Sequence, residues 1–373
     1  MAGKGKSLGL LISKDPRWVA GYNYCLNILK SLSFLSSDKM PRITILHLGE
    51  RPDLGNLSCL NLEYENISGG NMFGDHPRMA LVSRRKFKHK VDVLYPAYYP
   101  MPFFSGQAVY WIPDLQHEHH PQLFNRVQLL GRRAIIKAIS STRSIVVFSS
   151  DSAKKDFCRL YPKNKNNLKV LHFRAVLEPA EYEAKIAEIV QIKGKYSIKE
   201  NYFICSNQLW KHKDHLTVLQ SVKILKERGI SVSVVFTGNL EDYRVKGYYN
   251  TLIEYVDKNN IKDAVKFLGM ISRHEQLVLM KEAFAVVQPS LFEGWNTSIE
   301  EAKFLRKPVI ASDIDVHREQ QDENCYLFRA GDQIELANLM ESFVHSKPSY
   351  KKKDYDKLIR DFAEEFIKII EEA

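Results

Sequence analysis

Two glutamates separated by seven residues lie in the segment of this chain that is best suited to chemistry, Pro289-Ser-Leu-Phe-Glu-Gly-Trp-Asn-Thr-Ser-Ile-Glu-Glu-Ala302. The segment follows an apolar run, residues 283–288, that predicts a buried strand, and Gly294 permits a tight turn after it. Three successive residues beyond the turn are good N-cap residues for a helix: Asn296, Thr297 and Ser298. The N–H groups and the positive end of that helix would face a ligand beyond the strand, which suits a diphosphate.

The two acids, Glu293 and Glu301, also have ordinary structural explanations. Glu301 is spaced to complete a capping box with Ser298. Thr297 and Glu300 satisfy the same box, however, and this would leave Glu301 available to a ligand. Glu293 could be a surface acid.

A second strand, loop and helix start carries a lysine: Tyr202-Phe-Ile-Cys-Ser-Asn-Gln-Leu-Trp-Lys-His-Lys213-Asp-His. Ligands of open α/β sheets bind outside the carboxyl ends of the strands. Lys213 would therefore bring a point positive charge to the place where an anionic leaving group would lie. The alternative is a solvated lysine at a helix start.

Histidines gather in Trp111-Ile-Pro-Asp-Leu-Gln-His117-Glu-His-His-Pro121. His117, His119 and His120 do not have the H-E-x-x-H spacing of a zinc site, and no other ligand set accompanies them. We therefore expect no metal here and at most one functional histidine, His117.

The elements that must position these residues alternate between short apolar runs and helical periodicity, which predicts parallel strands joined by crossover helices. Gly229 is placed to end a helix over about 216–225, and a last helix over about 354–371 has one apolar stripe. Eleven strands are expected, at 8–13, 43–48, 91–95, 108–112, 144–148, 202–205, 232–237, 265–268, 283–288, 308–311 and 326–328.

The length of 373 residues favours two domains, and 45% hydrophobic with 26% charged residues excludes disorder and collagen. The net charge of +10 points to an anionic partner. Residues 1–200 carry net +13 and residues 201–373 net −3, so the basic half is the candidate for that partner. The tract 84–90 holds five cations and one phenylalanine. It could be a solvated helix face, it could bind an anionic membrane or acceptor surface, or, as the weakest alternative, it could bind nucleic acid.

Targeting signals are weak in this sequence. The apolar run at 8–12 is too short for a secretory signal, and no stretch approaches the 18 apolar residues of a membrane span. The five cysteines are scattered, without a C-x-x-C pair. We expect a reduced, cytoplasmic protein without structural zinc, which could act at the inner face of the membrane.

The E-x7-E spacing inside residues 289–302, followed by Lys307-Pro-Val-Ile-Ala-Ser-Asp313, resembles the retaining glycosyltransferases of family 4. In the first half the resemblance rests on the early Gly21 loop and on residues 111–121. It implies an α/β protein of the GT-B fold, in which two doubly wound Rossmann-like domains face each other across a cleft.

Carried over by position, the resemblance implies that Glu301 binds the ribose of a sugar nucleotide and that Lys213 neutralises its diphosphate. Glu293 would approach the transferred sugar near its reacting carbon. The backbone of Trp295, Asn296 and Thr297 would contact phosphate or sugar, and the turn at Gly269 and Met270 would hold the base.

Some positions depart from the family pattern. Asn207 stands where many members have an arginine, and Pro113-Asp114 replaces a His-Asp pair, so that His117 is the substitute on the sugar or acceptor side. Gly21 and Tyr22 are either a loop near phosphate or acceptor or a plain helix start. Asp313-Ile-Asp315 has the D-x-D spacing of metal-dependent glycosyltransferases, which chance produces often, and we expect no metal there.

The expected organisation is an acceptor-binding domain over 1–190, a linker over 191–200, a nucleotide-sugar domain over 201–353 and a helix over 354–373 that packs back on the first domain. The expected activity is metal-independent, retaining transfer of a sugar from a nucleotide-diphosphate sugar to a glycan or glycolipid acceptor in lipopolysaccharide or polysaccharide synthesis. The alternatives are a sugar-nucleotide epimerase or hydrolase of the same fold, or a basic binding module without catalysis. Nucleic acid is not an expected partner.

Overall fold

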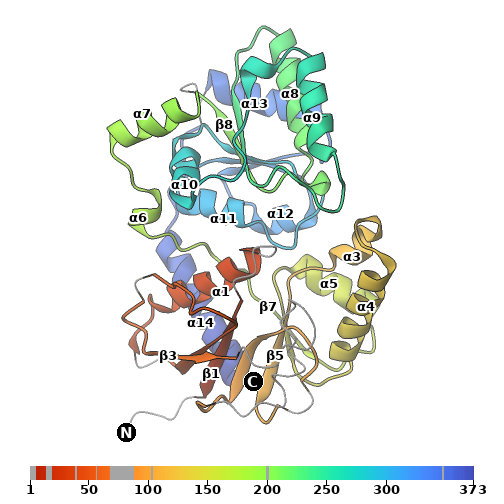
Figure 1. Ribbon diagram of the computed structural model, residues 1–373, viewed down its shortest axis with the longest axis vertical. Helices are drawn as coiled ribbons and strands as arrows, with labels where there is room; N and C mark the ends of the chain where they lie inside the picture. Colours follow the sequence, from red (N-terminus) through yellow and green to blue (C-terminus); the bar gives the residue numbers. More distant parts are fainter. Residues whose placement is uncertain are drawn as a thin grey trace. The chain divides into compact units, whose positions relative to one another are not determined.

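The computed structural model describes residues 6–13, 19–37, 40–55, 57–67, 88–101, 104–198, 201–346 and 348–373 (Figure 1). Most of the basic tract, residues 84–87, lies outside this description. The chain forms two compact units: residues 1–176 with 356–373 make unit 1, and residues 177–355 make unit 2. Within the described residues, no helix is both long and apolar enough to cross a bilayer.

Unit 1 is built on a parallel sheet whose described strands follow the order β3-β2-β1-β4-β5-β6-β7. Helices α4 and α5 contribute apolar side chains to the core on one face. Its strands are β1 (Ser7–Ile12), β2 (Arg42–His47), β3 (Leu62–Asn66), β4 (Val93–Ala97), β5 (Gln107–Ile112), β6 (Ile145–Phe148) and β7 (Asn167–Val170). Its helices are α1 (Val19–Leu32), α3 (Gln116–His119), α4 (Arg126–Ser140), α5 (Asp151–Leu160) and α14 (Tyr355–Glu372).

Unit 2 has a second parallel sheet with the described order β10-β9-β8-β11-β12-β13. Its strands are β8 (Phe203–Ser206), β9 (Val234–Thr237), β10 (Val265–Phe267), β11 (Val286–Gln288), β12 (Val309–Ser312) and β13 (Cys325–Phe328). Its helices are α6 (Pro179–Tyr182), α7 (Ile186–Lys195), α8 (His215–Glu227), α9 (Tyr248–Lys258), α10 (Arg273–Glu282), α11 (Thr297–Phe304), α12 (Asp315–Gln320) and α13 (Gln333–His345).

The two faces of the unit 2 sheet are covered by different helices. One core cluster is formed by α8, α9 and α13, and the other by α7, α10 and α11. Both sheets are thus doubly wound, as the alternating pattern predicted. In each sheet the strand order reverses at one point, between β1 and β4 and between β8 and β11, and ligand sites are expected beside these points.

All eleven predicted strands are present, and two further strands, β3 and β7, were not predicted. Both lie at the edges of the unit 1 sheet, and most of their residues are only half-buried. An edge strand with one wet face does not need a continuous apolar run, so its sequence signal is weak.

The helix end at Gly229 is as predicted. Gly229 has φ of +75°, and α8 closes with Gly229 N donating to Lys226 O at 3.0 Å and Ile230 N donating to Leu225 O at 2.9 Å. These two bonds form a Schellman motif, which favours glycine at this position.

The chain passes from unit 1 to unit 2 at Val176, before the linker expected at 191–200. The reason is that α6 and α7 pack on α10. His274 of α10 lies 3.2 Å from Glu181 O and 2.9 Å from a carboxylate oxygen of Glu188.

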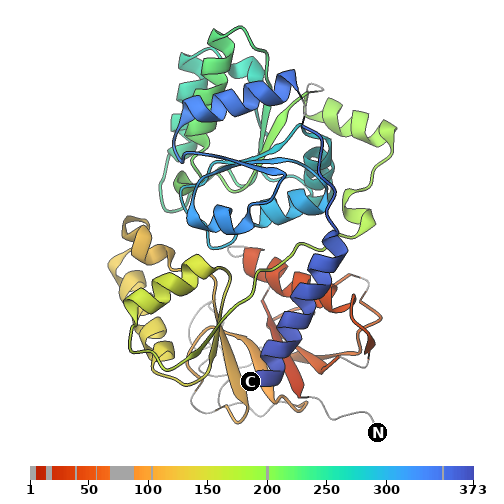
Figure 2. The same ribbon diagram turned by 180° about the vertical axis from the view of Figure 1, so that it is seen from behind.

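Helix α14 returns the chain to unit 1, where it lies along the sheet (Figure 2). The ring of Phe366 is 5.3 Å from that of Tyr95 on β4, and Lys169 on β7 pairs with Glu372 at 2.5 Å.

Candidate active site

The predicted donor-side residues follow the carboxyl ends of three strands of unit 2. Asn207 follows β8, and Lys213 ends a short 3-10 turn (Lys211–Lys213) in the same loop. Gly269 and Met270 follow β10, and Glu293 follows β11. These elements flank the switch point between β8 and β11, so the fold gathers at one edge residues that lie far apart in sequence.

Lys213 and Glu293 form an ion pair, with Nζ 2.6 Å from Oε1. The two side chains are only 13% and 8% exposed, so water screens the pair little. The same Oε1 accepts from Ser290 Oγ at 2.7 Å and from Asn296 Nδ2 at 3.1 Å. These three contacts hold the side chain of Glu293 in one orientation.

Asn296 is the N-cap of α11, and neither Thr297 nor Ser298 has that role. Its Oδ1 accepts from Ile299 N at 3.3 Å, while Nδ2 reaches Glu293. His317 fixes this orientation: its Nδ1 donates to Ser312 O at 2.8 Å, so Nε2 is the acceptor that faces Asn296 Nδ2 at 3.2 Å. Burial lowers the pKa of His317 to about 4, which keeps the ring neutral.

The start of α11 offers backbone donors, although not the full set expected from Trp295, Asn296 and Thr297. The Asn296 amide is occupied, because its N donates to Gln320 Oε1 at 3.0 Å. Among the described residues, the amides of Thr297 and Ser298 have no hydrogen-bond acceptor. These two amides and the helix dipole leave a positive end beside the Lys213–Glu293 pair.

Asn207 is held at both ends of its amide. His215 Nε2 lies 2.6 Å from Oδ1, and Nδ2 donates to Gln288 Oε1 at 2.9 Å. Burial, with the positive charge of Lys213, lowers the pKa of His215 to about 3, so the neutral ring donates through Nε2. The position that is often arginine in the resembled family is thus a neutral group in a buried polar network.

Glu301 is 2% exposed and takes no part in capping. Its Oε1 accepts from Arg273 Nη2 at 2.7 Å, and Arg273 begins α10, just after the predicted base-holding turn. This ion pair fixes the carboxylate of Glu301 beside the predicted base-holding turn.

The loop that carries Lys213 is braced by a buried acid in the next loop. Asp242 is 4% exposed and accepts from Lys211 N at 3.0 Å and from Arg244 N at 3.0 Å. Leu291 N also donates to His212 O at 2.8 Å, which ties this loop to the one carrying Glu293. The lysine is therefore presented by a fixed backbone.

The base-side turn after β10 and the loop after β9 each contain a glycine with positive φ. Gly269 has φ of +68°, and its carbonyl accepts from Gly238 N at 2.9 Å. Gly238 has φ of +122°, and a Cβ there would lie 2.3 Å from Asn207 O. Met270 is 68% exposed at the end of the turn. The close approach of strands β8 and β9 at this edge therefore requires glycine at 238.

In unit 1, His117 is a buried ring with an unsatisfied nitrogen. It is 1% exposed, and within the described residues Nε2 has no hydrogen-bond partner, the carboxylate of Glu118 lying 3.5 Å away. Burial lowers its pKa. Asp114 accepts from Gln116 N at 2.8 Å and so shapes the turn before the helix that carries His117.

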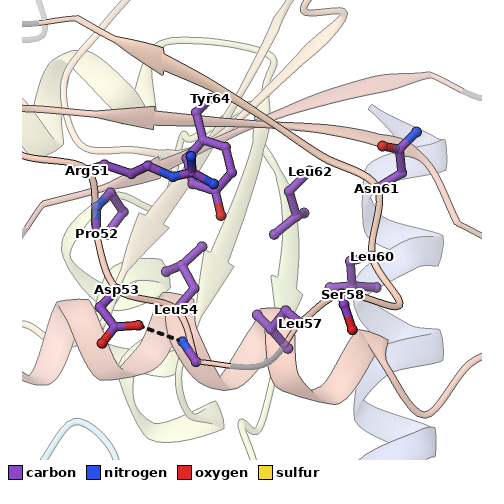
Figure 3. Close-up of a pocket in the computed structure, with 11 residues that line it drawn as sticks. Arg51, Pro52, Asp53, Leu54, Leu57, Ser58, Leu60, Asn61, Leu62 and Tyr64 are labelled. Atoms are coloured by element: carbon purple, nitrogen blue, oxygen red, sulfur yellow. Dashed lines mark hydrogen bonds between the residues drawn. The ribbon is translucent and has the colours of Figure 1, made fainter.

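Gly21 and Tyr22 lie inside the first turns of α1, which corresponds to the plain helix start and not to the loop alternative. The Tyr22 hydroxyl donates to Asp53 O at 2.6 Å and ties α1 to the loop after β2. That loop borders a hollow of about 470 Å³, in which Arg51 lies 3.5 Å from the Tyr64 ring centre (Figure 3).

The remaining metal-like patterns have other partners in the structure. His119 binds Asp156, and His120 is 3.4 Å from Gln122, so the two rings engage different neighbours from those of His117. Asp313 and Asp315 both contact Arg318, at 2.5 and 3.3 Å.

Residues 188–360 match the family described as Glycosyl transferases group 1. The match covers just under half of the chain and most of unit 2. The chain is 24% identical over 234 residues, 63% of this chain and 59% of the relative, to the O-antigen chain mannosyltransferase RfbU of Salmonella typhimurium. The chain thus spans less than two thirds of the length of that relative.

Solved structures confirm the fold. HepE of Anabaena in complex with UDP and glucose superposes with a TM-score of 0.67 at 18% identity, over 99% of this chain and 97% of that one. WaaG, a glycosyltransferase involved in lipopolysaccharide biosynthesis, gives 0.62 at 14% identity, over 98% of each chain. The chain therefore has the GT-B fold, with two Rossmann-like units.

Sequence reasoning missed several residues that organise this domain: Arg273, His215, His317 and Gln320. Arg273 had a weak signal, because it directly follows the turn expected to hold the base. The histidines and Gln320 had none, since their roles depend on partners brought by other strands.

Proposed function

We propose that this protein is a retaining glycosyltransferase that moves a sugar from a nucleotide-diphosphate sugar to an acceptor hydroxyl. The observation that carries the proposal is the Lys213–Glu293 pair beside the open amides of Thr297 and Ser298, within a glycosyl transferases group 1 domain. A cation and a helix N-terminus together are suited to the charge that develops on a departing diphosphate.

Retention is favoured by the state of Glu293. Its Oε1 already accepts from three donors, and this makes it a poor nucleophile. The acceptor hydroxyl would then attack on the face from which the diphosphate leaves, and a phosphate oxygen would take its proton. Glu293 stabilises the positive charge that builds on the sugar ring.

The donor charge is met by Lys213 and the helix start, and we propose that no metal is needed for transfer. Activity in excess EDTA should equal activity with added Mg²⁺. A requirement for Mg²⁺ would contradict this part of the proposal.

On the acceptor side, His117 in the basic first half is the residue proposed to contact sugar or acceptor. The relatives include an O-antigen chain mannosyltransferase and a glycosyltransferase involved in lipopolysaccharide biosynthesis. We therefore propose a glycan or glycolipid acceptor in cell-surface polysaccharide synthesis, used in the cytoplasm at a membrane. Replacing His117 by Ala should lower turnover and leave nucleotide affinity unchanged.

A thermal-shift screen of uridine, guanosine, thymidine and adenosine diphosphates and their sugars tests the proposal directly. One base class should raise the melting temperature by mass action. Incubation of the matching sugar nucleotide without acceptor then separates the alternatives, because an epimerase or a hydrolase would consume it. No shift with any nucleotide would overturn the proposal.

A further inference from the structure

Helix α4 of unit 1 carries four cations and no acid. They are Arg126, Arg132, Arg133 and Lys137. Asn125 and Gln128 form a capping box that starts the helix, with Gln128 N donating to Asn125 Oδ1 at 2.9 Å. Its buried face consists of Ile136, Ile139 and Ser140. Leu129 and Ile135 are half-buried, and the other residues of the helix are exposed.

The solvent face of α4 also exposes two large aliphatic side chains. Val127 is 80% and Leu130 67% exposed, and a spacing of three residues puts them on the same side of the helix. Single exposed aliphatic residues are common, but this pair adjoins an apolar hollow. The hollow has a volume of about 420 Å³ and lies between α4 and α5, lined by Leu130, Ala134, Leu160 and Tyr161, with Arg133, Lys137 and Glu118 around them.

The cations of α4 are not all used by the fold. Arg133 is paired with Glu118 through two bonds of 2.7 and 2.9 Å, and Arg132 lies 5.0 Å from the Phe124 ring centre. Arg126 and Lys137 are exposed at the two ends. Arg126 occupies the first turn, where the helix dipole disfavours a cation, so its position has a cost for folding.

We propose that α4 and the hollow beside it form a docking surface for an anionic lipid bilayer. The helix would lie in the headgroup region with Val127 and Leu130 pointing toward the acyl chains and Arg126 and Lys137 bound to lipid phosphates. The proposed membrane-facing surface therefore consists of described residues and does not include the tract 84–90. It deepens the proposed function, since a glycolipid acceptor would be found at such a surface.

Two other occupants fit less well. A second copy of the chain in a two-fold dimer would bring α4 against α4, and four cations on each side would repel. Nucleic acid would match the charge of the helix but would give Val127 and Leu130 no apolar partner.

The test is cosedimentation of the full chain with vesicles of phosphatidylcholine alone or mixed with phosphatidylglycerol, at low and high salt. Two double variants are compared with the unchanged protein: Val127→Gln with Leu130→Gln, and Arg126→Gln with Lys137→Gln. Matched controls remove two exposed cations, Lys258→Gln with Lys262→Gln, or one exposed aliphatic side chain, Ile334→Gln, in unit 2.

Binding should require phosphatidylglycerol and weaken with salt. Loss of the two α4 cations should weaken it roughly 30-fold, from about 1 kcal/mol for each cation near an anionic surface. Loss of the two aliphatic groups should weaken it roughly tenfold or more. The control variants should bind like the unchanged protein, and circular dichroism should be the same for all.

Absence of binding to anionic vesicles, or equal loss in the control variants, would overturn the docking surface. So would a dimer that dissociates when Val127 and Leu130 are replaced. None of these measurements needs transferase activity, so the result is independent of the nucleotide screen.

Discussion

At the scale of single residues, the site of unit 2 depends on charges that neutralise each other where water hardly reaches. Glu293 is held by Lys213, Ser290 and Asn296, and Glu301 by Arg273. Each acid is buried, so removing its partner leaves a carboxylate that cannot regain its hydration. If these acids bind the donor as proposed, stability and ligand binding are coupled at these positions.

Replacing Lys213 by Met should destabilise the protein by about 1–3 kcal/mol, because Glu293 loses its counter-charge. The double variant Lys213→Met with Glu293→Gln should recover most of this loss in urea unfolding. Both should lose roughly 10²–10³-fold in kcat, since the cation that stabilises the leaving group is gone. Retention of turnover by Lys213→Met would show that the lysine does not contact phosphate.

Replacing Arg273 by Met should weaken binding of the matching nucleoside diphosphate about tenfold, through the misplaced carboxylate of Glu301. If Glu301 binds ribose, the unchanged protein should prefer the ribonucleotide to its 2′-deoxy form, and the variant should lose this preference. Calorimetric titration measures both. Arg329→Met, at an exposed arginine of unit 2, is the control and should behave like the unchanged protein.

At the scale of elements, strand ends and helix starts decide where the groups of the site lie. Apolar runs predicted the three strands that precede the donor-side residues, β8, β10 and β11, and they did not predict the edge strands β3 and β7. The N-cap of α11 could not be chosen among three adjacent candidates, because His317 and Glu293, which orient the Asn296 side chain, are recruited by other elements.

Two glycines with positive φ allow a matched comparison. Gly229→Ala, at a helix end with open space around it, should cost about 1 kcal/mol in urea unfolding and leave nucleotide binding intact. Gly238→Ala should cost more and weaken nucleotide binding, because its Cβ would meet Asn207 O at 2.3 Å and shift the loop that leads to Lys213. If Gly229→Ala and Gly238→Ala changed nucleotide affinity equally, the close approach of Gly238 to Asn207 would not be what positions the loop for binding.

At the scale of the whole molecule, the chain forms two units, and α14 rejoins the first after the second is complete. Phe366 is fully buried against Tyr95, so the last residues belong to the core of unit 1. The amphipathic stripe of α14 predicted a buried helix. The helix was expected on the first domain, and the structure adds which strand it meets there, β4 through Tyr95.

Phe366→Ala should destabilise unit 1 by about 3–5 kcal/mol, through lost burial and a cavity. Hydrogen exchange should show faster exchange in β4 and β1, with the strands of unit 2 unchanged. An exposed neighbour on the same helix, Lys368→Ala, serves as control. Equal loss of protection in both units would mean that they unfold together.

The stability of unit 2 should fall with acid. Because burial lowers the pKa of His215 to about 3 and of His317 to about 4, both stay neutral when folded, whereas the unfolded chain binds protons near the ordinary value of 6.5. Their contribution is complete above pH 6.5 and is lost as pH falls toward the folded values. Within that window, each histidine should lower the free energy of unfolding by about 1.4 kcal/mol for each pH unit of acidification.

Urea unfolding of unit 2 at several pH values between those limits checks this slope. His215→Gln should reduce the slope by about half, whereas His345→Gln, at an exposed histidine, should leave it unchanged. A slope that is the same in all three proteins would contradict the assignment of neutral buried rings.

The sequence by itself determined the alternation of strands and helices, the placement of the E-x7-E segment and of Lys213 after strands, and the stop at Gly229. These features depend on residues close in the chain, through apolar periodicity, backbone freedom and capping. The tertiary structure decided the contacts Lys213–Glu293 and Arg273–Glu301, the neutral state of the buried histidines, the edge strands and the contact of Phe366 with Tyr95. Each of these depends on burial and on partners that only the folded sheets bring together.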